Sequence, residues 1–187
     1  GEFGTAWEQR VLCAYDPNDK AVEPAGAGSA GLIPVGTDRL LYTVRFQNTG
    51  NDTATTVVIH DHLSAQFDRS SLQVLGWTHP FTLRIENDGE ALFRFDNIML
   101  PDSGADQLGS QGHVIFSIGL LPGLSAGTVI ANTAQIVFDL NPPVITNTTV
   151  NTLFDCLLAS TTITDLGSNT LLAGPGSHYQ WALDGLP

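Results

Sequence analysis

Positively charged side chains are scarce in this sequence. Its 187 residues contain seven Lys and Arg against nineteen Asp and Glu, which gives a formal net charge of −12. A chain with this charge repels phosphate backbones and anionic lipid headgroups. Nucleic-acid binding is therefore excluded, whereas binding of a cation or of a basic partner remains open.

Long apolar runs and helical periodicity are also missing. No run approaches the roughly 20 residues that a membrane helix requires, so membrane insertion is not expected. Stretches with a 3.6-residue repeat are hard to find, which argues against a helical domain. The 42% hydrophobic content is nevertheless sufficient for a packed core.

The sequence shows the two-residue alternation of half-buried strands. In Arg39–Gln47, Leu40, Tyr42, Val44 and Phe46 share one face. Turn-forming Asn, Gly, Pro and Asp residues separate this run from others of similar length. The expected strands are Arg39–Gln47, Ala54–Asp61, Leu72–Leu75, Phe81–Ile85, Ala91–Ile98, Val114–Leu120, Val129–Phe138 and Val144–Phe154. This spacing predicts an all-β fold, a sandwich of two antiparallel sheets, with Pro24–Gly36 as a surface loop.

The chain divides into one full domain and a fragment. Residues 1–5 read as a cloning scar and 6–12 as a linker. The sandwich is expected over residues 13–156. Residues 157–187 contain three short strand-like runs, too few for a separate sandwich, and are expected to begin a second module as a truncated β segment.

The two cysteines bracket the predicted sandwich. Cys13 precedes its first strand and Cys156 follows its last. The ends of a sandwich commonly lie close together, so a disulfide and an oxidising compartment are expected. The alternative is two unpaired, half-buried thiols.

One polar constellation stands out. Lys20 is the only lysine of the chain. Strand alternation places Asp61 on the face of Val57 and Ile59, and Asn132 on the face of the apolar residues that follow it, so both polar side chains are expected to face the core. Buried carboxylates and amides need partners.

If Lys20 enters the same layer, its amine can attack the carboxamide of Asn132 while Asp61 polarises the carbonyl and shuttles a proton. The products are ammonia and a Lys–Asn isopeptide crosslink. The alternative places Lys20 at an exposed strand end, Asp61 at the start of a turn and Asn132 in a β-bulge.

Two other sites are considered. Oxygen-bearing side chains near the first strand and at the end of Val129–Phe138 suit Ca²⁺, with Asx-turn capping as the alternative; the candidate ligands are Asp16, Asn18, Asp19, Asp139 and Asn141. Trp77, His79 and Phe81 form a candidate aromatic sugar platform, with core or edge packing as the alternative. No nucleophile–base motif of a hydrolase is found.

Four blocks together resemble a known family. Tyr15–Lys20, Phe46–Ala54, Leu100–Ser103 and Asn132–Pro143 are similar, in this order, to a conserved-repeat β-sandwich domain of unknown function in large secreted and cell-surface proteins of gram-negative bacteria that use type IX secretion. The resemblance covers about Cys13 to Asn147.

The resemblance implies an extracellular, non-catalytic, immunoglobulin-like module in which Lys20, Asp61 and Asn132 recur together. It also implies that Ser177–Gly185 is the third strand of a further immunoglobulin-like module. The expected function is a structural or adhesive spacer that contacts neighbouring domains of the same protein. The alternatives are a calcium-stabilised interaction module and a carbohydrate-binding accessory module of a secreted hydrolase, whose partner would be a polysaccharide or another cell-surface ligand.

Overall fold

The computed structural model describes residues 17–155, 163–165 and 171–173, and all regular elements among them are β-strands. The chain separates into two units, residues 1–154 and 155–187. In the second unit, Ile163–Asp165 (β13) pairs antiparallel with Leu171–Ala173 (β14). The part of the chain that the structure describes contains no helix with the length and hydropathy needed to cross a bilayer.

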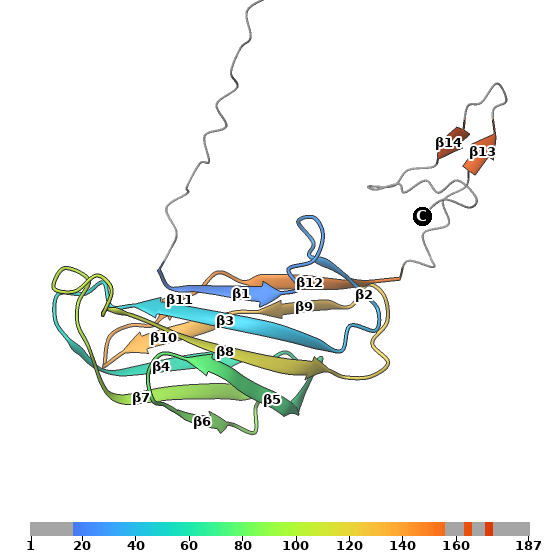
Figure 1. Ribbon diagram of the computed structural model, residues 1–187. Helices are drawn as coiled ribbons and strands as arrows, with labels where there is room; N and C mark the ends of the chain where they lie inside the picture. Colours follow the sequence, from blue (N-terminus) through green and yellow to red (C-terminus); the bar gives the residue numbers. More distant parts are fainter. Residues whose placement is uncertain (1–16, 156–162, 166–170, 174–187) are drawn as a thin grey trace, which may run out of the picture. The chain divides into compact units, whose positions relative to one another are not determined.

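The first unit is a sandwich of two main sheets with a small third sheet (Figure 1). The first sheet has the order β1 (Asp19–Glu23), β3 (Arg39–Gln47), β8 (Gln111–Leu120), β5 (Phe67–Trp77). The second sheet has the order β11 (Val144–Ile145), β10 (Ala134–Phe138), β4 (Ala54–His62), β7 (Glu90–Leu100), β6 (Thr82–Ile85). The third sheet has the order β2 (Leu32–Pro34), β12 (Thr149–Phe154), β9 (Val129–Asn132).

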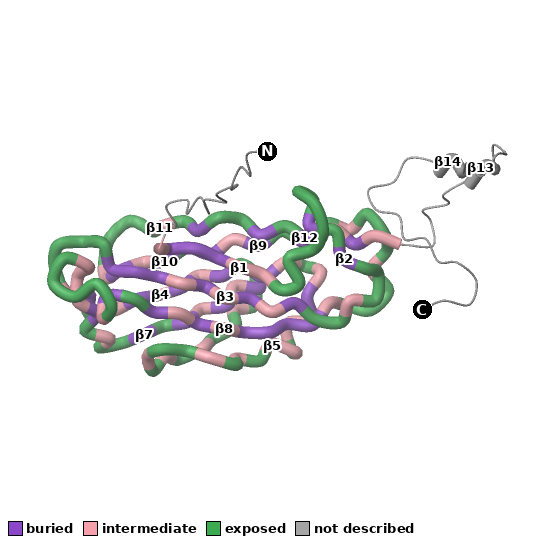
Figure 2. Tube along the Cα trace, turned by 45° about the horizontal axis from the view of Figure 1, so that its top comes forward, coloured by how far each residue is buried: buried purple, intermediate pink, exposed green. Residues whose placement is uncertain are grey.

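Apolar residues of both main sheets form one core. Figure 2 shows where buried residues occur along the strands of the sandwich. The alternating residues of β3 are buried as predicted, with Leu40, Tyr42 and Val44 at 0% exposure. The rings of Tyr42 and Phe116 stack within the first sheet at 5.4 Å between centroids, and Phe93 of the second sheet lies 5.3 Å from Phe116. The predicted immunoglobulin-like antiparallel sandwich is confirmed.

Two of the predicted strands are each divided into two shorter strands in the structure. The strand predicted over Val129–Phe138 is interrupted at Thr133, because the chain passes from the third sheet in β9 to the second sheet in β10. The edge strand predicted over Val144–Phe154 is likewise divided into β11 and β12. These two breaks face each other, since the backbone of Ala134 exchanges hydrogen bonds with Thr146 in the gap between β11 and β12.

The remaining corrections concern a loop and an edge. Residues 24–36 are not all loop, because β2 pairs in parallel with β12 and buries Ile33. The strand predicted over Leu72–Leu75 extends over Phe67–Trp77 as an irregular edge strand with breaks in its register to β8. Asp68 and Ser70 at its start bond to each other as in a turn, which hides the strand in the sequence.

Candidate functional site

Lys20, the only lysine of the chain, lies in the core, where a residue of this type is rarely found. It stands on β1 opposite Val44 of β3 and is 2% exposed. Its Nζ lies 4.8 Å from the ring centroid of Tyr42 and 5.5 Å from that of Phe116. The exposed strand-end alternative for Lys20 is therefore wrong.

The ammonium group of Lys20 is paired with Asp61. Its Nζ donates a hydrogen bond to Oδ2 of Asp61, and both side chains are fully buried. Burial lowers the pKa of Lys20, and the attraction of the Asp61 carboxylate only partly opposes this effect. The site therefore favours the neutral, nucleophilic form of the amine more than water does.

Asp61 and Asn132 both face the core, as strand alternation predicts. Asp61 is 0% exposed and lies between Ala134 of β10 and Ala91 of β7 in the second sheet. Asn132 is 2% exposed and ends β9, where it pairs with Thr149 of β12. Both side chains lie close enough to the Tyr42 hydroxyl to act on its pKa, so Asp61 and Asn132 share one region of the core.

The polar atoms of this layer are poorly satisfied. Oδ1 and Nδ2 of Asn132, Oδ1 of Asp61 and the hydroxyl of Tyr42 are buried without a hydrogen-bond partner among the described residues. A buried amide that makes no hydrogen bond costs several kcal/mol, about 2–7 depending on the reference state. An asparagine at this position therefore needs a partner that the hydrogen bonds among the described residues do not supply.

Tyr42 connects the three groups. Burial raises the pKa of the Tyr42 hydroxyl, and the neighbouring Asp61 carboxylate raises it further. The side chains of Asn132 and Thr149 lie close enough to act in the opposite direction, although neither reaches hydrogen-bond geometry with the hydroxyl. Lys20, Asp61 and Asn132 therefore surround one tyrosine in the same layer.

Asn147 is a member of the site that the sequence does not reveal. Its Oδ1 accepts a hydrogen bond from the backbone N–H of Lys20 at 2.9 Å, and its Nδ2 donates to the Lys20 carbonyl at 2.8 Å. In the sequence it is conspicuous only as part of a glycosylation sequon. No periodicity links an exposed residue before β12 to the first strand.

Three of the candidate calcium ligands, Asn18, Asp19 and Asp139, already contact donors of the protein. Oδ1 of Asn18 accepts the backbone N–H of Gln47, and the Asp19 carboxylate pairs with Arg45 at 2.8 Å. Asn141 is exposed, and Asp16 lies outside the described residues. No group of three or more His, Cys, Asp or Glu that could hold a metal occurs in the described ranges.

Asp139 acts as a cap instead. At φ 51° its carboxylate accepts the hydroxyl and backbone N–H of Thr55 and the backbone N–H of Thr56. The Thr55 hydroxyl contributes most to lowering the pKa of Asp139. This geometry fits the capping alternative and gives the calcium hypothesis no support.

The aromatic candidates do not form one flat face. The rings of Trp77 and Phe81 lie 5.9 Å apart at 74°. Phe81 packs against the core rings of Phe93 and Phe95, while Trp77 is 55% exposed. A hollow of about 470 Å³ beside them is lined by Val74, Trp77, Pro80 and Phe81, and His79 is not part of it. A sugar ring would find one exposed aromatic surface here, not a platform of three residues.

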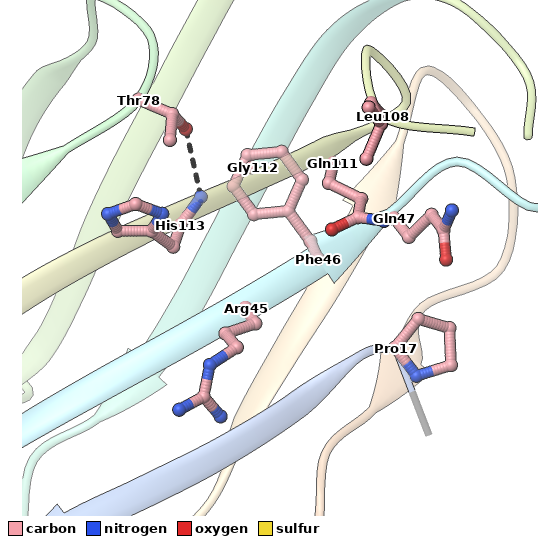
Figure 3. Close-up of a pocket in the computed structure, with 9 residues that line it drawn as sticks. All are labelled: Pro17, Arg45, Phe46, Gln47, Thr78, Leu108, Gln111, Gly112 and His113. Carbon is pink, nitrogen blue, oxygen red and sulfur yellow. Dashed lines mark hydrogen bonds between the residues drawn. The ribbon is translucent and has the colours of Figure 1, made fainter. Parts of the chain in front are cut away.

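A second hollow, of about 410 Å³, lies beside the paired ends of β3 and β8 (Figure 3). Its lining residues are Pro17, Arg45, Phe46, Gln47, Thr78, Leu108, Gln111, Gly112 and His113. None of the residues predicted as site residues lines it, and the lining contains no carboxylate and no cysteine.

The predicted disulfide cannot be placed, because Cys13 and Cys156 lie outside the described residues.

Comparison with known proteins adds a family and a fold. A family model described as a domain of unknown function, DUF7619, matches residues 16–152. No curated protein sequence matches the chain.

Two solved pilin structures share the fold. Domains D2 and D3 of the major pilin SpaD from Corynebacterium diphtheriae are 15% identical with a TM-score of 0.51, and the match covers 71% of this chain and 51% of that one. A variant of BcpA, the major pilin subunit of Bacillus cereus, is 15% identical with a TM-score of 0.51, and the match covers 72% of this chain and 39% of that one. The chain thus spans about half or less of the length of these pilin structures.

The buried ion pair generates a stability prediction. We expect Lys20→Met and Asp61→Leu, each made alone, to be less stable than the double variant by about 3–5 kcal/mol, because each single change leaves an uncompensated buried charge. Denaturant unfolding of the three variants measures this difference. A double variant no more stable than the singles would show that the pair is not desolvated.

The Asp139 cap generates a pH prediction. Because its folded pKa is lowered from 3.8, Asp139 contributes stability above that value and loses it as the pH falls through the folded pKa. We expect Asp139→Asn, which tolerates positive φ, to cost about 1 kcal/mol at neutral pH and almost nothing in strong acid.

Chemical unfolding at the two pH values provides the measurement, with the exposed Asp38→Asn as control. An equal loss for Asp139→Asn at both pH values would contradict a role of the negative charge.

Proposed function

The chain belongs to the DUF7619 family, and from this premise we propose that it is a non-catalytic structural or adhesive spacer of a secreted or cell-surface bacterial protein, strengthened by an isopeptide bond between Lys20 and Asn132. The pilin folds of similar architecture support the spacer role. Type IX secretion and a Cys13–Cys156 disulfide remain predictions from the sequence.

The observation that carries the proposed bond is the unpaired amide of Asn132. Both of its polar atoms are buried and find no hydrogen-bond partner in the part of the chain that the structure describes, in the layer that also holds the buried Lys20–Asp61 pair. As separate side chains, these groups cost free energy through desolvation. Joining Lys20 to Asn132 removes both the buried charge and the primary amide, so it relieves the two costs together.

The reaction needs no cofactor. Lys20 Nζ passes a proton to the Asp61 carboxylate, and the resulting neutral amine attacks Cγ of Asn132. The Asp61 carboxyl group then hydrogen-bonds the carbonyl oxygen, which stabilises the tetrahedral intermediate.

As the intermediate collapses, Nδ2 takes up a proton through Asp61. The Cγ–Nδ2 bond breaks and ammonia leaves, while the new Cγ–Nζ bond remains. One C–N bond has replaced another, so no oxidant or reductant is consumed. Nδ2 leaves with the proton that Nζ loses after the attack, and Asp61 keeps the proton that it first took from Lys20, so that no charge remains in this layer.

The rings around Lys20 help the first step. Tyr42 and Phe116 exclude water from the amine, and this desolvation lowers the pKa of Lys20. An amine in water is almost wholly protonated at neutral pH and cannot attack. The same aromatic layer that makes a lysine costly therefore makes it reactive.

The bond would suit a spacer under tension. It would join β1, the first strand of the sandwich, to β9, which pairs with the last strand β12. Tension entering at β1 would pass across the bond to residue 132 and bypass the residues between 20 and 132. Most of the core, including β3, β4, β7 and β8, lies within this protected loop.

Intact-mass spectrometry of the reduced full chain tests the proposal. We expect the folded protein to be lighter than its sequence by one ammonia, and a protease digest to contain a branched peptide that joins residues 20 and 132. Lys20→Ala, Asp61→Ala and Asn132→Ala should each retain the full mass, because each lacks one participant in the reaction.

The matched control is Asn151→Ala, which removes another buried asparagine but should still lose ammonia. The branched peptide separates the bond from ring closure of an asparagine elsewhere, which also releases ammonia. A folded wild-type chain with the full sequence mass would refute the bond.

A further inference from the structure

The three residues that link β11 to β12, together with Thr149 at the start of β12, hold both partners of the proposed bond. We call Thr146–Thr149 the connector. Asn147 bonds to the backbone of Lys20 on both sides, and Thr149 Oγ1 donates to the carbonyl of Asn132 at 3.2 Å. Thr146 and Thr148 contact the two residues after Asn132. The backbone N–H of Thr146 donates to the Ala134 carbonyl, and the Thr146 hydroxyl accepts from the Ala134 backbone N–H. The hydroxyls of Thr148 and Thr133 lie 2.6 Å apart.

We infer that Asn147 is a positioning residue for the Lys20–Asn132 bond, since it fixes the nucleophile's backbone to the connector that also holds the electrophile's backbone. This inference rests on the proposed function. Asn147 touches neither Nζ of Lys20 nor the amide of Asn132 in any contact described above, so its role is to set their separation.

The side chain of Asn147 satisfies the backbone of Lys20 on the edge of β1 that has no neighbouring strand. Lys20 pairs with Val44 of β3 on one side of β1, and β1 is the edge of its sheet. The N–H and C=O of Lys20 both bond to Asn147, so they point away from β3. The carboxamide of Asn147, with one donor and one acceptor, therefore satisfies Lys20 as a neighbouring strand would.

The connector brings two sheets together at this point. Lys20 belongs to the first sheet, whereas Asn132 ends a strand of the third and leads into the second. No ladder hydrogen bond joins β1 to β9, so their relative position depends on intermediaries. Asn147 and Thr149, two residues apart on one extended segment, provide a short link.

Chain order gives this link a further consequence. The connector follows Lys20, Asp61 and Asn132 in the sequence, so it is the last of these parts to be synthesised. The reacting groups are held in register only when β12 has docked. Bond formation is thereby coupled to completion of the sandwich, which keeps a partly folded chain from being crosslinked.

The test measures the rate of bond formation in the full chain. Cell-free synthesis, quenching in denaturant at intervals and intact-mass analysis give the fraction that has lost ammonia over time, and protease resistance gives the folded fraction. We expect Asn147→Ala to slow the reaction of folded chains about 10²-fold, the effect of misplacing a reacting group by roughly 1 Å. Asn147→Asp, which can still accept from the Lys20 N–H, should be intermediate.

Asn151→Ala is the matched control. Nδ2 of Asn151 also ties β12 to the chain after β1, by donating to the Pro24 carbonyl at 3.0 Å, but it does not contact Lys20. This variant should lose stability and keep the wild-type rate once folded.

The other outcomes contradict either positioning by Asn147 or the Lys20–Asn132 bond itself. Wild-type rates for Asn147→Ala, or equal slowing by Asn151→Ala, would refute positioning by Asn147 and leave the proposed bond intact. If Asn147→Ala is protease-sensitive, Asn147→Asp takes its place, and a wild-type rate for that variant is equally decisive. A wild-type chain that folds and never loses ammonia would overturn the bond and the inference together.

Discussion

The desolvation of one lysine is the constraint on which this sandwich depends. Nζ of Lys20 sits against two aromatic rings, where an isolated ammonium would be far too costly, and the Asp61 carboxylate is the counter-charge that makes the position tenable. The two residues come from different sheets. Their contact therefore fixes how the first and second sheets face each other, which apolar packing alone specifies less sharply.

The break between β9 and β10 determines where Asn132 lies relative to the buried Lys20–Asp61 pair. β9 and β10 form one continuous run in sequence, yet the chain changes sheets at Thr133, immediately after Asn132. An uninterrupted strand would keep Asn132 in the ladder of the second sheet, beyond the end of β4. The change of sheet moves Asn132 to the third sheet, next to β12, and still leaves Ala134 opposite Asp61.

Strand alternation revealed the buried polar residues but not what holds them. Asp61 and Asn132 could be placed in the core because each shares a face with apolar residues two positions away, and Lys20 was conspicuous as the only lysine. Asn147 could not be found in this way, because its partner is 127 positions away and its own side chain lies on the surface. β2 was missed for a similar reason, since a single buried side chain, Ile33, gives no alternation to detect.

The oxygen-rich residues show a different limit of sequence analysis. Asn18, Asp19 and Asp139 have the composition of a calcium site, but each meets a donor from the protein: a backbone N–H, an arginine, or a threonine with its neighbour. A sequence shows which atoms can bind a cation and not whether the chain has already supplied their partners. The side-chain amide of Asn132 is the reverse case, because it is buried and no side chain or backbone group within residues 17–155 forms a hydrogen bond with it. That difference is the reason to assign chemistry to the buried amide of Asn132 and a structural role to Asn18, Asp19 and Asp139, whose oxygens accept hydrogen bonds from the protein.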